Sequence, residues 1–361
     1  MRRAFPSNLP ARQRGAAIIT ALLVVALAAI LVSGLLWREQ VQIRRIENQR
    51  LRDQAQWTAR SATDWTRFIL RTQADVAPID YLGGEWAVPI APTRVADVLG
   101  HEGDDDPIAD KTYLSGSIED ADARYNLRNL VWSPTPGALQ PNPSQVRHFQ
   151  RLLQLLNLDT ELAGPISQYV RRSVQGQVTR FQAAPGAASG AMGTAAPPAT
   201  AGDGAFSSRP GLQEGDDAAA SLPLPPLDLD ALLAVPGVTP DVIARLRPFA
   251  LFLPVPSTVN LNTASAEVLA AMIPGLNLDQ AQQLVVSRDQ AYFVNLGDLA
   301  NRLGSSQLAA QADNSQLDVR SCFFIVHGQI DLERAHVQRD TVLYRDYVTH
   351  TTRIVSTRDT Y

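Results

Sequence analysis

The polarity of the chain changes abruptly near its start. Residues 1–15 are polar and basic, whereas Ala16–Leu36 carries no charged side chain over 21 residues. At about 1.5 Å of rise per residue, this run spans roughly 30 Å, the thickness of a bilayer core. Trp37 and Arg38 follow it and suit the headgroup region. The pattern predicts a transmembrane helix over residues 16–36.

The same helix is expected to continue past the membrane. No proline or glycine occurs from Trp37 to Thr72, and apolar residues recur at helical spacing as far as Ile69. The first expected stop is Pro78. We therefore predict one helix of about 55 residues and about 80 Å, whose second part, 37–75, is amphipathic and packs on a folded domain. A cleaved secretory signal does not fit, because its apolar region spans only about 7–15 residues.

After the long helix, the hydrophobic period changes to that of strands. Runs with period two predict strands at Thr112–Glu119 and Ala123–Leu127, and the pattern becomes helical from Ser144. Short helices interrupted by Pro-Gly turns follow over 222–304. Further β-rich runs are expected at Val319–Ile330, Val337–Tyr344 and Tyr347–Val355. Because strands lie on both sides of the helical segment, the two halves of the sheet must meet in space to bury their apolar faces.

The pattern as a whole predicts an α+β fold, with a long N-terminal helix packed on an antiparallel sheet and a large inserted all-α domain. Residues 183–220 are rich in Ala, Gly, Pro and Ser, and we predict that they are disordered. The expected parts, in chain order, are a basic leader at 1–15, the transmembrane segment at 16–36, the amphipathic segment at 37–75, the first part of the sheet domain at 76–143, the inserted helical domain at 144–312 and the rest of the sheet at 313–361.

Composition and side-chain chemistry give no sign of an enzyme. The net charge of −4 does not indicate a nucleic-acid partner. The single cysteine, Cys322, lies in an apolar run, so we expect a buried, inert thiol and no intrachain disulfide. We find no phosphate-binding loop, and five histidines lack metal-ligand spacing and a partnered nucleophile. These histidines are His101, His148, His327, His336 and His350. We expect neither catalysis nor a required cofactor.

The junction between the basic leader and the apolar helix has a recognisable form. A basic leader that ends in Gly15 and directly abuts an apolar helix resembles the prepilin-peptidase site of type IV pilins and pseudopilins. The resemblance implies a cut between Gly15 and Ala16, with Ala16 as the N-methylated mature terminus. A residue without Cβ lets the peptidase take the backbone in extended form most cheaply. A plain signal anchor, in which Gly15 is accidental, is the alternative.

The start of the mature helix departs from the usual pilin pattern. Most pilin-like proteins carry glutamate at the fifth mature position, where it pairs with the terminal amine of a neighbouring subunit. The fifth position here is Thr20, and no Glu occurs between Ala16 and Leu36. An unpaired charge in lipid is expensive, so the missing carboxylate removes a strong docking device. A subunit that starts a filament has no neighbour ahead of it and does not need one.

This combination resembles the minor pseudopilin K family of type II secretion systems. The likeness extends to Leu36–Asn48, Ile118–Asp120, Tyr125–Leu130 and Val259–Ala264. It implies a tip subunit that initiates and caps the secretion pseudopilus for protein export across the outer membrane. It also implies a single-pass inner-membrane protein with its bulk in the periplasm. The implied partners are the minor pseudopilins I and J, the prepilin peptidase, the inner-membrane secretion platform and membrane lipid.

Partner contacts are expected along the amphipathic part of the long helix, through parallel helix packing. The residues expected on this face are Val41, Ile46, Trp65 and Ile69.

Two Pro-Gly turns raise a rival interpretation. Val235–Thr239 and Ile273–Asn277 resemble helix-hairpin-helix turns, which present backbone N–H groups to phosphates. With Val259–Ala264, they also resemble membrane-anchored competence DNA receptors. Against DNA binding, Asn277 replaces a second glycine, and residues 222–304 are net acidic. We favour a protein scaffold without a nucleic-acid partner.

Within that scaffold, Asn260, Asn262 and Thr263 are expected to act as turn and capping residues. Thr263 or Ser265 is expected to start the helix Ala266–Met272.

Calcium is the one ion that the family resemblance suggests. Hard cations need several converging oxygen ligands. The stretch Ile166–Arg172, where such carboxylates are expected by resemblance, carries arginines instead. The remaining weak candidates are Glu214, Asp216 and Asp217, with the acidic run Asp104–Asp106 elsewhere. Acidic runs in loops are usually just solvated, so no metal site is assigned.

Overall fold

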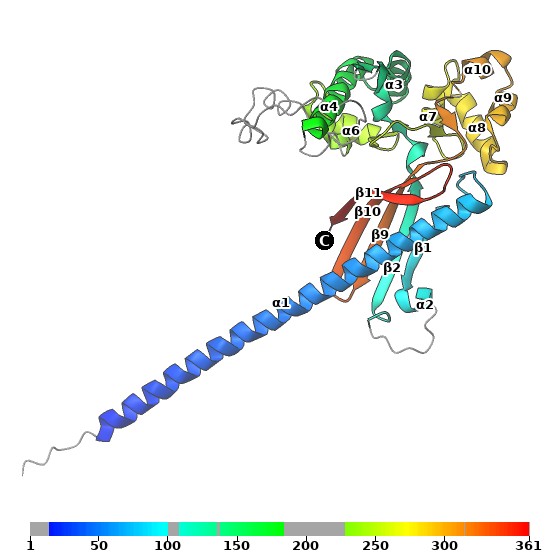
Figure 1. Cartoon of the computed structure of the whole chain (residues 1–361). Coiled ribbons are helices and arrows are strands. Elements are labelled where there is room, and N and C mark those ends of the chain that lie inside the picture. The colour runs from blue at the N-terminus through cyan, green and yellow to red at the C-terminus, as the bar shows by residue number, and fades with distance from the viewer. Residues whose placement is uncertain (1–13, 100–107, 136–137, 184–227, 314, 361) are drawn as a thin grey trace, which may run out of the picture.

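The computed structural model describes residues 14–99, 108–135, 138–183, 228–313 and 315–360. Its longest element is helix α1, Arg14–Val76, with 63 residues, which corresponds to about 95 Å. The single long helix predicted from the sequence is therefore confirmed, and it ends just before Pro78. In Figure 1 the first half of α1 extends well away from the rest of the molecule. Among the described residues, this is the one helix long and apolar enough to cross a membrane.

A five-stranded antiparallel sheet lies against the second half of α1, in the order β1-β2-β9-β10-β11. The strands are β1 Ile90–Arg94, β2 Thr112–Asp120, β9 Phe323–Leu332, β10 Ala335–Arg345 and β11 Thr352–Thr360. Strand β2 precedes the helical segment and pairs with β9, which follows it, from Thr112 opposite Leu332 to Asp120 opposite Phe324. The predicted meeting of the two halves of the sheet is thus confirmed.

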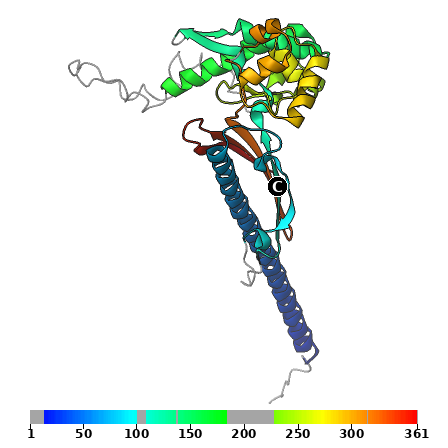
Figure 2. The same ribbon diagram turned by 90° about the vertical axis from the view of Figure 1, so that its right-hand side faces the viewer.

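Small and apolar side chains of α1 face the sheet. Ala55 and Ala59 are buried against Leu114, Ile330 and Val337. One end of the sheet packs in the same way, where Leu70 of α1 joins a cluster that includes Trp86, Phe324 and Leu343. Burial of these apolar surfaces stabilises the contact between α1 and the sheet. Figure 2 shows α1 running along the sheet from this angle as well.

Two of the predicted strands are wrong in their extent. Only Tyr125–Asn126, strand β3, is extended in the region predicted as a strand over Ala123–Leu127. The side chains of Asp120 and Asn126 accept hydrogen bonds from the backbone two residues on and so favour 3-10 turns on either side. Residues 347–351 are likewise a turn, because the Asp346 carboxylate accepts from the backbone of the next residues.

Between β2 and β9 lies a compact helical unit, by which we mean the described residues 121–318. Its helices are α3 Pro143–Leu155, α4 Ala163–Ala183, α6 Pro240–Leu246, α7 Ala266–Met272, α8 Leu278–Gln290, α9 Leu296–Arg302 and α10 Ser306–Gln311. Short strand pairs join them, namely β3 with β6 Ala250–Leu251, β4 Val131–Thr135 with β5 Ala138–Pro141, and β7 Val259–Asn260 with β8 Leu317–Asp318. A short helix, α2 Val95–Leu99, lies outside the unit, after β1.

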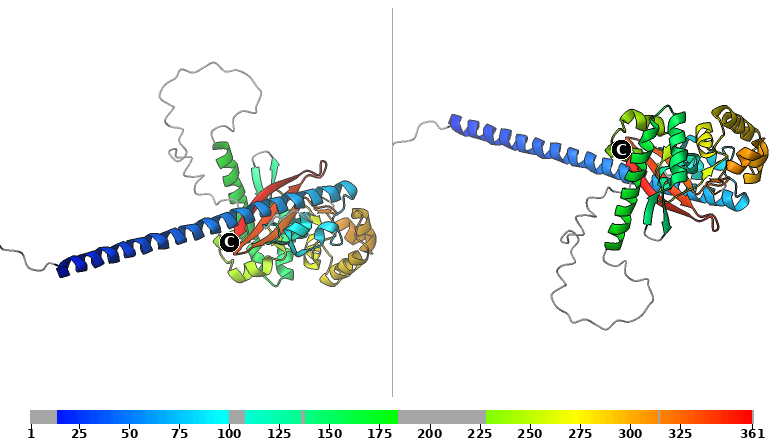
Figure 3. Two further views of the ribbon diagram at one scale, coloured as in Figure 1. Left: turned by 90° about the horizontal axis from the view of Figure 1, so that it is seen from below. Right: turned by 90° about the horizontal axis from the view of Figure 1, so that it is seen from above.

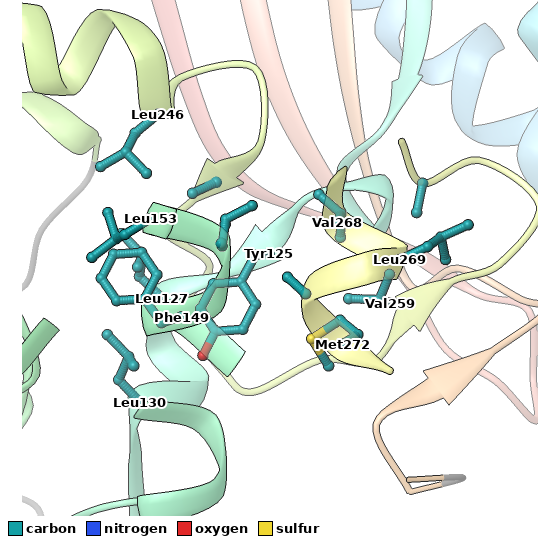
Figure 4. Packing of buried hydrophobic residues seen from close by; sticks show 14 of the residues in the cluster. Tyr125, Leu127, Leu130, Phe149, Leu153, Leu246, Val259, Val268, Leu269 and Met272 are labelled. Atoms are coloured by element: carbon teal, nitrogen blue, oxygen red, sulfur yellow. The ribbon is translucent and has the colours of Figure 1, made fainter. Parts of the chain in front are cut away.

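The helical unit has a core of its own. Tyr125 and Phe149 stack with ring centroids 5.7 Å apart, and Figure 4 shows them beside Leu127 and Leu153. The unit lies beyond the end of the sheet that is far from the N-terminal half of α1 (Figures 1 and 2). Both views of Figure 3 show the N-terminal half of α1 extending away from the rest of the molecule. The α+β fold predicted from the sequence is confirmed, with these short strand pairs added to the inserted helices.

Candidate functional site

The N-terminal processing residues lie in the first turns of α1. Gly15 and Ala16 are helical, and the Ala16 side chain is outside the described part of the structure. Cleavage between them and methylation of Ala16 therefore stay predictions. Thr20 follows one turn later, in the stretch where every described residue from Ile18 to Gln40 is exposed. This exposed stretch of α1 is without cover from the folded body.

A row of large apolar side chains runs along the side of α1 that faces away from the sheet. Ile46, Trp57 and Phe68 are 66%, 64% and 64% exposed. They are spaced eleven residues apart, which is close to three helical turns, so they lie nearly in line. We call Ile46, Trp57 and Phe68 the outer stripe. The fold of this chain leaves these three large apolar side chains without cover.

The four residues predicted to form the partner-binding face do not share one face of α1. Ile46 belongs to the outer stripe, whereas Ile69 is half-buried against the cluster around Leu70. Trp65 is 41% exposed on the flank between them, and Val41 is partly exposed. The partner-binding role itself stays a prediction. The sequence signal for the outer stripe is a large apolar residue that recurs every eleven positions along α1.

A buried group of polar side chains joins the helical unit to the sheet. The Asn260 amide nitrogen lies 3.0 Å from Asp120 Oδ2, 2.8 Å from Ser321 Oγ and 3.1 Å from the carbonyl oxygen of Asp80. Thr263 Oγ1 and Ser321 Oγ each donate to Asp120 Oδ2 at 2.5 Å. All five residues are buried. We call this group the junction; it connects β2, β7, the segment just before β9 and the loop after α1.

Arg345 of β10 extends the junction to the long helix. Its guanidinium pairs with the Asp80 carboxylate and donates to the carbonyl oxygens of Leu70, at 3.0 Å, and Ser321, at 2.9 Å. A buried charge is tolerated only when it is paired and hydrogen-bonded, as Arg345 is. The end of α1, the sheet and the helical unit are therefore held by one connected set of bonds.

Inside the helical unit, two asparagine side chains each form a pair of hydrogen bonds with the backbone of a distant residue. Asn262 donates to the Phe293 carbonyl oxygen at 3.0 Å and accepts from the Phe293 N–H at 2.7 Å. Asn129 forms the same two bonds with the backbone of Ser257, at 2.8 and 3.1 Å. Of the three residues expected in turn and capping roles, Asn260 makes a local turn bond, because its Oδ1 accepts from the Asn262 N–H at 2.9 Å. The side chains of Asn262 and Thr263 bond instead to distant segments, at Phe293 and Asp120. Of the two candidate N-caps of α7, the structure selects Ser265, whose hydroxyl accepts from Val268 N.

Two neighbouring carboxyls near the junction, those of Asp120 and Asp122, both have a raised pKa. Burial raises the pKa of Asp122 to about 8, and the charge of Asp120 adds to that shift. Burial also raises the pKa of Asp120, while its hydrogen bonds from Ser321 and Thr263 oppose the rise. Asp122 Oδ2 accepts from the backbone N–H groups of Cys322 and Phe323, but its Oδ1 has no partner among the described residues. Asp122 therefore holds a proton more readily than an ordinary aspartate does.

The glycines of the two Pro-Gly turns are exposed, but each lies close to a side chain of a neighbouring element. Gly237 and Gly275 have φ values of 88° and 86°, a left-handed conformation that favours glycine. A Cβ at Gly275 would lie 2.9 Å from Gln311 Oε1 and 3.0 Å from Leu308 Cδ2, both of α10. At Gly237, it would lie 3.1 Å from Leu162 Cδ2.

The remaining chemical candidates give no reactive centre. Cys322 is buried, and burial raises the pKa of its thiol to about 12, which confirms the expected inert cysteine. His327 lies between Asp340, at 2.7 Å, and Glu119, at 3.5 Å, and these hydrogen bonds raise its pKa. In the part of the chain that the structure describes, no group of three or more His, Cys, Asp or Glu residues is arranged to hold a metal ion. The weak calcium candidates Glu214, Asp216 and Asp217 lie outside the described residues.

The architecture defines a class. A long N-terminal helix whose apolar half extends free of the body, and whose second half packs on an antiparallel sheet, is the architecture of pilin-like subunits. Family models described as "Type II secretion system (T2SS), protein K" match residues 123–255 and 259–320. The chain belongs to this family, and it is therefore a minor pseudopilin.

Curated relatives and a solved structure agree with this assignment. The type II secretion system protein K of Pseudomonas aeruginosa is 28% identical over 326 residues, covering 89% of this chain and 85% of its own length. That of Aeromonas hydrophila is 24% identical over 323 residues, covering 87% of each. A chain in the GspK-GspI-GspJ complex of enterotoxigenic Escherichia coli matches the fold with a TM-score of 0.58 at 17% identity, over 88% of this chain and 99% of its own.

The junction predicts a specific loss of stability when its central amide is removed. Asn260→Ala leaves Asp120 without one of its buried donors, so we expect the free energy of unfolding to fall by about 1–3 kcal/mol. Asn48→Ala, an exposed Asn-to-Ala change on α1, is expected to stay within about 0.5 kcal/mol of the parent. Urea unfolding of the full chain in detergent compares them. Equal midpoints for the two variants would show that the junction does not stabilise the fold.

Protonation of Asp122 predicts how stability varies with pH. Its folded-state pKa is about 8 against 3.8 for an ordinary aspartate, so the folded protein binds one more proton than the unfolded chain between these values. The free energy of unfolding therefore falls as pH rises from about 4 to about 8, by at most about 1.4 kcal/mol per pH unit from this group.

The neutral isostere removes this contribution. Asp122→Asn should unfold with a shallower dependence on pH, while His327 still contributes stability that is present below pH 6.5 and lost as pH rises through its raised pKa. Parallel curves for parent and variant over pH 6–8.5 would mean that Asp122 is already ionised in the folded protein.

Proposed function

We propose that this minor pseudopilin occupies the tip of the type II secretion pseudopilus, where it initiates and caps the filament in protein export across the outer membrane. The observation that carries the proposal is the position of the helical unit beyond the far end of the sheet, on a helix that starts without charge. After cleavage between Gly15 and Ala16 by the prepilin peptidase, the helix stays anchored in the inner membrane. The bulk of the chain lies in the periplasm.

The uncharged start of the helix supports a leading position. With Ala16 as the first mature residue, Thr20 stands where most pilin-like subunits carry glutamate. A subunit with that carboxylate neutralises the terminal amine of a neighbour inside the apolar filament core, where a lone charge is expensive. A chain with Thr20 does not offer this pairing. It is suited to the one position in the filament that has no subunit ahead.

The shape of the molecule supports the same position. The helical unit widens the chain at the end remote from the N-terminal half of α1 (Figures 1 and 2). Inside a filament of parallel helices, this bulk would collide with the neighbours, whereas at the tip it projects into free space. This favours one copy for each filament.

The outer stripe supports packing against other pilin-like helices. Ile46, Trp57 and Phe68 repeat about every 16 Å along α1, and they face away from the sheet. The solved relative was determined in a complex of GspK, GspI and GspJ. We propose that the corresponding I and J subunits pack on α1 of this chain in parallel, and that the inner-membrane secretion platform receives the resulting complex. The chain acts as a structural subunit and not as an enzyme.

The test of the tip proposal changes the charge at one position. Thr20→Glu restores the carboxylate found in filament-body subunits, and Thr20→Gln is the matched variant of the same size without charge. We expect the Glu variant to enter filament bodies or to arrest assembly, with a loss of at least tenfold in secreted protein. The Gln variant should secrete like the parent. If secretion and filament position are identical for Glu and Gln, the tip argument from the missing charge fails.

A further inference from the structure

An apolar hollow lies between α1 and the sheet, with a volume of about 250 Å³. On one side the hollow is lined by α1 residues that include Ala62. On the other side it is lined by the sheet, where Gly116 of β2 lies directly opposite Gly328 of β9. Neither glycine contributes a side chain at this point, and Ala59, Ala62 and Thr63 of the facing helix are small. Larger side chains complete the lining, among them Trp65, Ile69 and Ile330.

The glycine pair is only partly required by the backbone. A Cβ at Gly116 would lie 2.5 Å from the His327 carbonyl oxygen, so glycine is needed there for close approach of β2 and β9. A Cβ at Gly328 would meet its first neighbour, the Arg339 carbonyl oxygen, only at 3.7 Å, and its φ is not in the left-handed region. A larger residue at Gly328 would fill the hollow without strain. Because unfilled cavities destabilise a fold, the hollow has no role in folding.

The mouth of the hollow is apolar and adjoins the outer stripe. Trp65 and Val88 line it and are 41% and 65% exposed, with Ile90 beside them. Trp65 and Phe68 are three residues apart on α1, so their side chains are neighbours on the helix surface. A partner that packs on the outer stripe therefore reaches the mouth.

The size of the hollow selects the kind of occupant. Sites for small molecules usually enclose about 300–1,000 Å³, and this hollow is smaller. In contrast, helices that lie side by side insert single side chains of one helix into holes on the other. The lining is mostly apolar, with a minority of polar residues that includes Glu85, His327 and Arg339, so it favours an apolar occupant over a charged one.

We propose that this hollow receives one large apolar side chain from the parallel helix of a neighbouring pilin-like subunit. The proposal rests on the proposed function, because it takes the partner to be a subunit whose helix lies along α1. Insertion buries the exposed parts of Trp65 and Val88 and fills the space above Gly116 and Gly328. The contact fixes the partner along the axis of α1, which the outer stripe alone does not do.

The first experiment fills the hollow from inside. In Ala62→Leu, the chain's own side chain takes the space, and Ala300→Leu makes the same change at an exposed position of α9. The full chain is purified in detergent, its thermal unfolding is measured, and its binding to the I and J subunits of the same system is titrated. We expect Ala62→Leu to unfold at the same or a higher temperature but to bind at least tenfold more weakly. Ala300→Leu should bind like the parent.

Unchanged binding by a folded Ala62→Leu protein overturns the proposal, since the hollow would then be a packing void only. If that variant does not fold, Val88→Cys decides the question by labelling with a maleimide. Cys322 is buried, so the label reports on position 88 alone. Labelling at least tenfold slower in the complex than in the free chain supports insertion, and equal rates overturn it.

A third variant separates this proposal from the proposed function. Phe68→Asp places a charge on the outer stripe, where it opposes helix packing without touching the hollow. If Phe68→Asp abolishes binding and Ala62→Leu does not, the hollow is no receptor while the partner-binding helix stands. If neither changes binding, the partner-binding role of α1 fails as well.

Discussion

The arrangement of this protein depends on a buried set of hydrogen bonds around one carboxylate. Asp120, at the end of β2, accepts from Asn260, Thr263 and Ser321, which come from two segments far from β2 in the sequence. Buried polar groups are stable only when their partners are in place, so the bonds specify one docking of the helical unit on the sheet. Arg345 carries the same constraint to the end of α1. The bulk of the chain is thereby fixed beyond the far end of the sheet.

Different parts and faces of the long helix lie in three different environments. Its first part is exposed and apolar, as lipid requires. Further on, Ala55, Ala59 and Leu70 face the sheet, while Trp57 and Phe68 point the other way. Residues that face away from the body and remain apolar are unexplained by the fold of the single chain. Packing of α1 against the helices of other subunits in a filament, the role proposed for it, would cover these residues.

Local features of the fold could be predicted well from the sequence. Helix α7 has the predicted bounds Ala266–Met272, and β2 differs from its predicted range by one residue, because both follow from regular hydrophobic periods. Strand β1 was missed, since it is an edge strand that contains proline. The strand predicted over Ala123–Leu127 failed because polar side chains there bond to the backbone and favour turns.

Features of the candidate site that depend on long-range contacts could not be predicted in the same way. The hydrogen bond between Asn260 and Asp120 joins residues 140 positions apart, and no periodicity in the sequence predicts it. The hollow under α1 depends on the register that sets Gly116 opposite Gly328. The partner face on α1 was predicted as a single set, but the sheet covers Ile69 and leaves Ile46 free. In contrast, the inert character of Cys322 followed from its apolar neighbours alone.

The central claim is that one such chain stands at the end of each filament with its helical unit outermost. Gold-labelled antibody against the helical unit, imaged by electron microscopy on pseudopili isolated from the membrane, tests it most directly. The account predicts a single label at one end of each filament and none along the shaft. Labels distributed along the shaft, or filaments that carry no label at either end, would contradict it.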